Sequence, residues 1–318
     1  MGRLPPDVDG RQNTEAFVRA YNGAKYATWA SLPHRLHEHE HELVARFVPD
    51  TRAQIATIGC GAGRETFGLH DRGYSKTVGF DCAPALLACA EEENRRRGTR
   101  LPFVQAWAQN LPVSDGVFDA VTMFTNVFGH ITPEAARRSA LLEMRRVLRP
   151  GGILLLEVTS LSHIYRYRLA LYLLNTWRRI HNPANLEPYD KLVASARAAG
   201  LSQRDAPRSH WFTEHSVRRE AEQAGFQVIR LSTVNEIVRN PHADATRFWG
   251  EGRICLVARP SGVVCSRSVT DAAAHQWPCR PVRRARPGGW SCRLHSDFKN
   301  WIRSAFSLSL SANFSTCE

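Results

Sequence analysis

The sequence predicts an α/β fold in which helices cover both faces of a doubly wound, mostly parallel sheet. Short apolar runs that suit buried parallel strands alternate along the chain with segments of helical periodicity. The first two runs, residues 55–58 and 76–80, enclose three glycines at alternate positions, and the second run ends at Asp81. A strand, a glycine turn, a helix, a second strand and a terminal acid form a nucleotide-binding unit.

Gly59, Gly61 and Gly63 give the predicted turn its chemistry. Glycine tolerates positive φ and, because it lacks Cβ, lets a ligand lie against the backbone. The helix expected from Arg64 onward directs free N–H groups and the positive end of its dipole at that ligand. Asp81 follows Gly59 at close to the spacing of about 20 residues expected of an acid that binds ribose hydroxyls.

The spacing of the glycines distinguishes between nucleotide ligands. A dinucleotide turn has the pattern G-x-G-x-x-G, and a P-loop ends in Lys followed by Ser or Thr, whereas residues 59–63 spell G-x-G-x-G without such a Lys. The segment resembles the first two motifs of class I S-adenosylmethionine (SAM)-dependent methyltransferases, in particular the type 11-like group. The resemblance implies SAM as cofactor, S-adenosyl-L-homocysteine as product, and a Rossmann-like seven-stranded sheet whose last strand is antiparallel.

Periodicity and turn residues predict the remaining elements. Ala140, Met144 and Leu148 recur on one side of a helix over 134–148, and the Arg-Pro-Gly-Gly turn at 149–152 ends it. Thr213 caps a further helix, which Gly225 ends. The other expected elements are a helix over 83–97, strands over 101–105, 120–124 and 153–158, and strands over 226–231 and 253–258. Residues 111–124 and the turn before 153 also resemble the family.

The expected organisation has three parts. Residues 1–50 form N-terminal helices, which Pro33 divides and which in the resembled family cover the cofactor. Residues 51–262 form the methyltransferase domain, with an insertion at 161–210 that we interpret as a lid. Residues 263–318 change to Ser, Arg, Cys, Trp and Pro, and we expect a basic, disordered tail. Tyr21 or Tyr26 either contacts the cofactor or packs in the core.

Composition limits the class of protein. The chain has 318 residues, 43% apolar and 23% charged, and a net charge of +12, which is compatible with RNA, anionic lipid or acidic substrates. Its eight cysteines include no C-x-x-C pair, and we expect those of the core to be reduced thiols. No signal region and no apolar run long enough to span a membrane is present, so we expect a cytoplasmic protein.

Residues 37–41 fit the letters of H-E-x-x-H, a zinc motif of metalloproteases. No third ligand is evident nearby, and the motif lies just before a nucleotide-binding unit. We therefore interpret the segment as a solvated His/Glu face of a helix and expect no metal.

The resemblance implies a set of cofactor contacts. Glycines 59, 61 and 63 would lie at the methionine and ribose, with Cys60 between them, and Asp81 at the ribose hydroxyls. Two positions depart from the family, because Thr57 and Trp107 stand where acids are common. The expected cofactor-binding residues are Gly59, Cys60, Gly61, Gly63, Asp81, Cys82, Trp107, Ala108 and Asn126.

His130 follows a central strand and is the candidate general base, with a helix-start or packing role as the alternative. Glu157 and His163 are weaker candidates. The aromatic, apolar stretch at 161–180 favours a small-molecule acceptor. The alternatives are an RNA methyltransferase, for which we find no separate RNA-binding module, and a non-catalytic SAM-binding homologue. The acceptor atom and the oligomeric state stay open.

Overall fold

A computed structural model describes residues 11–22, 30–161, 173, 176–177, 190–192, 208–240 and 253–262. The predicted tail at 263–318, most of the 161–210 insertion, and both Tyr26 and His163 lie outside the described residues.

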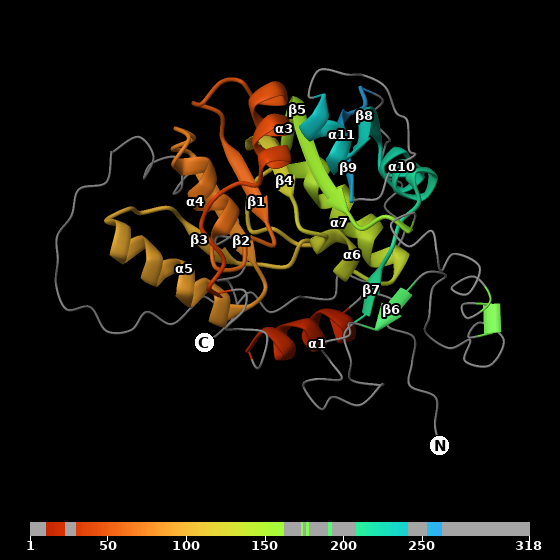
Figure 1. Ribbon diagram of the computed structural model, residues 1–318, viewed down its shortest axis with the longest axis horizontal. Helices are drawn as coiled ribbons and strands as arrows, with labels where there is room; N and C mark the ends of the chain where they lie inside the picture. Colours follow the sequence, from red (N-terminus) through yellow and green to blue (C-terminus); the bar gives the residue numbers. More distant parts are fainter. Residues whose placement is uncertain are drawn as a thin grey trace, which may run out of the picture.

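The described chain folds around one seven-stranded sheet, which confirms the predicted fold class (Figure 1). The strand order is β3-β2-β1-β4-β5-β9-β8, and β9 alone runs antiparallel to its neighbours in this sheet. Chain order reverses between β1 and β4, and ligands of open α/β sheets bind at such a point. The strands are β1 (Ile55–Ile58), β2 (Thr77–Asp81), β3 (Phe103–Gln105), β4 (Phe118–Met123), β5 (Leu148–Val158), β8 (Phe226–Thr233) and β9 (Ile254–Pro260).

Alternate residues of the central strands enter two hydrophobic clusters, one on each face of the sheet. Ala56 packs in the cluster that contains α7 (Glu134–Val147) and α10 (Glu214–Gln223), and Ile55 packs in the cluster that contains α3 (Glu38–Phe47) and α11 (Val234–Arg239). Two more helices, α4 (Arg64–His70) and α5 (Pro84–Arg97), make the crossovers that follow β1 and β2. The sheet is therefore the middle layer of three.

Two segments differ from the sequence predictions. A short ladder of β6 (Asp190–Leu192) and β7 (Arg208–His210) lies in the 161–210 insertion, where the sequence predicted no strand. Three-residue strands are too short to show a period of two. The connection after β8 includes α11, a helix that was not predicted from the sequence, and its Ile237 packs in the core with residues of α3.

The His/Glu segment before β1 is another correction. His39 and Glu40 are 3% and 0% exposed, so the predicted solvated face is wrong for these two residues. His39 Nε2 lies 2.8 Å from a carboxylate oxygen of Glu157, and Glu40 receives two hydrogen bonds from Arg64. The polar side chains face inward because partners from β5 and α4 satisfy them.

The N-terminal helix α1 (Arg11–Asn22) lies across the same end of the sheet as β6 and β7 (Figure 1). Asn13 fixes it there: its Oδ1 accepts a hydrogen bond from the backbone N–H of Arg208 at 2.8 Å. Its Nδ2 donates to the carbonyl oxygens of His130, at 2.7 Å, and of Arg208, at 3.2 Å. One side chain thus joins α1 to α6 (Val127–His130) and β7.

Candidate active site

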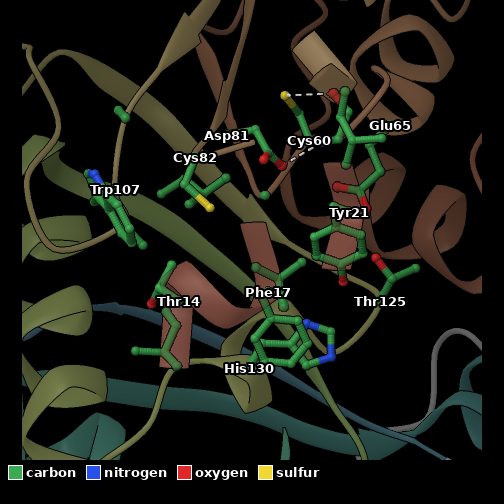
Figure 2. Close-up of a pocket in the computed structure, with 18 of the residues that line it drawn as sticks. Thr14, Phe17, Tyr21, Cys60, Glu65, Asp81, Cys82, Trp107, Thr125 and His130 are labelled. Carbon is green, nitrogen blue, oxygen red and sulfur yellow. Dashed lines mark hydrogen bonds between the residues drawn. The ribbon is translucent and has the colours of Figure 1, made fainter. Parts of the chain in front are cut away.

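A cavity lies between α1 and the carboxyl ends of β1, β2 and β4 (Figure 2). From α1 come Thr14, Phe17 and Tyr21; the glycine turn and α4 contribute Gly59–Ala62, Arg64 and Glu65. The opposite wall comes from Asp81, Cys82, Leu86 and residues 106–109, and the floor from Thr125, Val127, His130 and Ile131. The site therefore forms at the end of the sheet where parallel strands present their ligand-binding residues.

The three glycines of the turn all have positive φ but serve different purposes. A Cβ on Gly59 would come within 2.4 Å of Val127, and a Cβ on Gly63 within 2.6 Å of Phe67. These two positions need glycine for packing, and Gly63 does not line the cavity. A Cβ on Gly61 would approach only Leu86, at 3.7 Å, so the backbone of Gly61 faces the cavity without an obstructing side chain.

Asp81 ties the glycine turn to β2. Its Oδ2 accepts a hydrogen bond from the backbone N–H of Gly61 at 2.7 Å, and its Oδ1 accepts one from Ala83 at 2.8 Å. Burial raises the pKa of Asp81, although these backbone donors oppose the shift. Each carboxylate oxygen keeps a second lone pair, so Asp81 can still accept hydrogen bonds from a ligand.

Tyr21 lies opposite Asp81 and is the predicted tyrosine that the structure brings to the cavity (Figure 2). Burial, and then the negative charge of Asp81, raise the pKa of its phenol. The hydroxyl consequently stays protonated at neutral pH and can act as a hydrogen-bond donor.

Residues 106–109 form the wall expected at the adenine. Trp107 and Ala108 line the cavity, in a turn closed by a hydrogen bond of 2.9 Å from Asn110 N–H to the Trp107 carbonyl. Gln109 also lines it, and the sequence analysis did not identify this residue. Its Nε2 is buried without a hydrogen-bond partner among the described residues.

Glu65 is a second cavity residue that the sequence analysis missed (Figure 2). It is 3% exposed, and its Oε1 accepts a hydrogen bond from Arg64 at 2.9 Å. Its Oε2 has no hydrogen-bond partner in the part of the chain that the structure describes. Burial raises the pKa of Glu65 to about 8, against the opposing charge of Arg64.

Thr57, which replaces a common acid of the family, is turned away from the cavity. Its Oγ1 lies 2.6 Å from Oγ1 of Thr66 and 3.3 Å from the carbonyl oxygen of Val78. The side chain is fully buried and satisfied inside the fold. Position 57 therefore supplies no ligand contact here.

His130 lies in the cavity at the end of α6, and its ring stacks on Phe17 with centroids 4.2 Å apart (Figure 2). Glu157, the weaker candidate base, is fully buried and does not line the cavity. It belongs instead to a group with His39 and Cys255, whose potential ligand atoms all lie within 4.8 Å of one another. Arg253 pairs with the same carboxylate and so supplies a positive charge to that group.

Asn126 is not brought to the cavity. Its backbone is left-handed, with φ of 61°, at the start of α6. Its Oδ1 accepts a hydrogen bond from Thr159 N–H at 2.7 Å, and its Nδ2 donates to Ser209 Oγ at 3.0 Å. The side chain connects the ends of β4, β5 and β7, and so supports the floor beneath His130.

Comparison with known proteins identifies this arrangement. A family model described as a methyltransferase domain matches residues 55–152, from β1 to the turn within β5. Residues 55–152 therefore belong to a methyltransferase domain of the class I SAM-dependent type. A SAM-dependent methyltransferase from Methanosarcina mazei has the same fold, with a TM-score of 0.55 and 20% identity over 71% of this chain and 99% of that one.

Three curated methyltransferases are similar in sequence. The demethylmenaquinone methyltransferase of Thermus thermophilus is 39% identical over 31% of this chain and 44% of its own length. The malonyl-[acyl-carrier protein] O-methyltransferase of Geobacter sulfurreducens is 28% identical over 75% and 78%. The human probable tRNA methyltransferase 9B is 34% identical over 39% and 25%. The chain spans about half the length of the first curated relatives that it matches.

The residues that line the cavity fit SAM. Gly61 leaves its backbone open, and Asp81 keeps lone pairs for the ribose hydroxyls. Two buried polar atoms of the cavity wall, Glu65 Oε2 and Gln109 Nε2, lack a partner among the described residues, and polar groups of a ligand would satisfy them.

The described residues include no helix long and apolar enough to cross a membrane.

Proposed function

We propose that this protein transfers the methyl group of SAM to a small-molecule acceptor. The observation that carries the proposal is the Asp81–Gly61 hydrogen bond of 2.7 Å, which fixes a carboxylate and an open backbone at the wall of one cavity. Bound SAM supplies an electrophilic methyl group. Because that group is already reactive, the protein has chiefly to align the acceptor and exclude water.

The acceptor would enter the cavity beside His130 and beneath α1. Phe17 and Ile131 give this side an apolar lining, which suits an acceptor with an apolar or aromatic body. We propose that a ring nitrogen of His130 accepts the proton that the hydroxyl or amine group of the acceptor loses. We further propose that residues 161–210 form the lid and that residues 1–50 help to cover the cofactor.

The names of the relatives support methyl transfer more strongly than any one acceptor. One is named for demethylmenaquinone, one for malonyl-[acyl-carrier protein] and one for tRNA. The cavity beneath α1 favours the small-molecule acceptor over a large, folded RNA. Methylation of RNA is therefore an alternative outcome that the test below distinguishes.

The test incubates the full-length protein with SAM labelled in its methyl group and with two separate acceptor pools. One pool is a low-molecular-weight extract, and the other is total tRNA. We expect label in products of the first pool, and loss of that label in Asp81→Ala. Label found only in tRNA would show that the acceptor is RNA and not a small molecule. No label in either pool, with no binding of S-adenosylhomocysteine measured by calorimetry, would overturn methyl transfer itself.

A further inference from the structure

One carboxylate oxygen of the cavity makes no hydrogen bond within the described part of the chain. Glu65 is 3% exposed, and its Oε2 is buried and without a partner there. Leaving a buried polar atom unsatisfied costs about 1–3 kcal/mol, and more when the group is charged. Because Glu65 lines the cavity, a bound ligand can reach this oxygen (Figure 2).

The charges around Glu65 leave a place for one further cation. Arg64 donates to Glu65 at 2.9 Å and also to both oxygens of Glu40, at 2.8 and 2.6 Å. Two carboxylates thus share a single guanidinium. The next carboxylate on this side, Glu157, already has His39 and Arg253 as partners. A cation bound at Oε2 of Glu65 would balance the Glu40–Arg64–Glu65 group.

The position that commonly supplies a carboxylate in this family cannot do so here. Thr57 has no charge, and its hydroxyl contacts Thr66 inside the fold at 2.6 Å. Glu65 is the neighbour of Thr66 on α4 and reaches the cavity that Thr57 does not. Glu65 thus supplies, on the helix that follows β1, the carboxyl group that the end of β1 lacks, and a bound cation would favour its ionised form.

We propose that Glu65 binds the ammonium group of the methionine part of SAM, in place of an acid at position 57. This inference rests on the SAM site proposed above. An ammonium group has three N–H donors, one of which satisfies Oε2, and its charge balances the two carboxylates around Arg64. Asp81, whose oxygens already hold Gly61 and Ala83, is left for the ribose.

The experiment is a thermodynamic cycle that varies one residue of the protein and one group of the ligand. Binding is measured by calorimetry on the full chain. The ligands are S-adenosylhomocysteine and its deamino analogue, in which hydrogen replaces the amino group. The proteins are the wild type and Glu65→Gln, which keeps the shape of the side chain. We expect the wild type to prefer the amino ligand at least tenfold (about 1.4 kcal/mol) and Glu65→Gln to bind both ligands within about threefold.

Glu220→Gln is the matched control, because Glu220 is also a buried carboxylate paired with an arginine, Arg137, and lies outside the cavity. It should keep the wild-type preference, and thermal unfolding checks that each variant is folded. If Glu65→Gln does not fold, Glu65→Met, which also removes the carboxylate and has a side chain of similar length, replaces it in the cycle. An unchanged preference for the amino ligand in the folded variant would overturn the inference. Failure of the wild type to bind either ligand would instead overturn the proposed function.

Discussion

The carboxylate of Asp81 accepts a hydrogen bond from the backbone of Gly61 at 2.7 Å, which joins the second strand to the glycine turn across the mouth of the cavity. Because the same carboxylate also accepts from Ala83, its removal leaves two buried backbone donors without their partner. The side chain therefore shapes the turn before any ligand arrives.

Asp81→Ala should accordingly lower stability as well as binding. We expect the free energy of unfolding to fall by about 1–3 kcal/mol, as for other unsatisfied buried groups. Urea denaturation of the free protein measures the loss. Asp81→Asn is the control, because its amide keeps one acceptor oxygen and should lose less. Equal stability of Asp81→Ala and the wild type would show that the two hydrogen bonds contribute nothing to the turn.

The stability of the free protein should depend on pH through Glu65. Its pKa is raised to about 8 in the folded protein, above the ordinary value of 4.5. The folded state therefore binds the proton more tightly, and the resulting stability is fully present below about pH 4.5 and is lost as pH rises through about 8. The wild type should lose stability relative to Glu65→Gln across this interval. Urea denaturation at several pH values measures the difference between the two curves, and parallel curves would contradict the assigned shift.

Gln109→Leu should make the free protein more stable. The substitution removes a buried Nε2 that has no partner among the described residues, and it puts an apolar side chain of similar size in the cavity wall. We expect a gain of about 1 kcal/mol without ligand. The thermal shift produced by S-adenosylhomocysteine should decrease, because the amide no longer meets the ligand. A variant that is less stable and is shifted as much by the ligand would show that the amide is satisfied in the free protein.

His130→Asn distinguishes the two roles considered for His130, accepting a proton from the acceptor and packing against α1. If His130 accepts the proton of the acceptor, the rate of methyl transfer should fall by about 10²–10⁴ while the affinity for S-adenosylhomocysteine changes little. Asparagine keeps the backbone carbonyl that accepts from Asn13, so α1 stays attached. The matched control is Phe17→Leu, which removes the ring that stacks on His130 at 4.2 Å but leaves the imidazole. A loss of affinity with an unchanged rate would assign His130 to packing.

Much of the fold could be predicted because local patterns carry it. The run at 55–58, the glycines and the terminal Asp81 identify the β1–α4–β2 unit, and apolar periodicity identifies α7. The three-residue strands β6 and β7 have no such pattern, since their pairing joins residues far apart in the chain. Long elements could be recognised from sequence, and short pairings could not.

The site was predictable in its backbone and less so in its side chains. The structure brings Gly61, Asp81, Trp107 and His130 to one cavity, whereas Asn126 turns to Thr159 and Ser209, and the binding and catalytic roles of all five stay predictions. Glu65 was missed because an acid in the first turn of a helix is usually exposed and helps the helix dipole. Only the contact of Arg64 with Glu40 on another helix shows that this corner of the site is buried and charged.

Asn13 joins α1 to a backbone 195 positions further along the chain. During synthesis α1 leaves the ribosome long before β7 exists. Asn13 can meet the His130 carbonyl earlier, but its two hydrogen bonds with Arg208 cannot form until Arg208 has been made. The glycine turn and Asp81 are complete much earlier. On a growing chain, the walls of the cofactor cavity would therefore be complete before α1 is attached to β7. The cavity would stay open to water until those last contacts form.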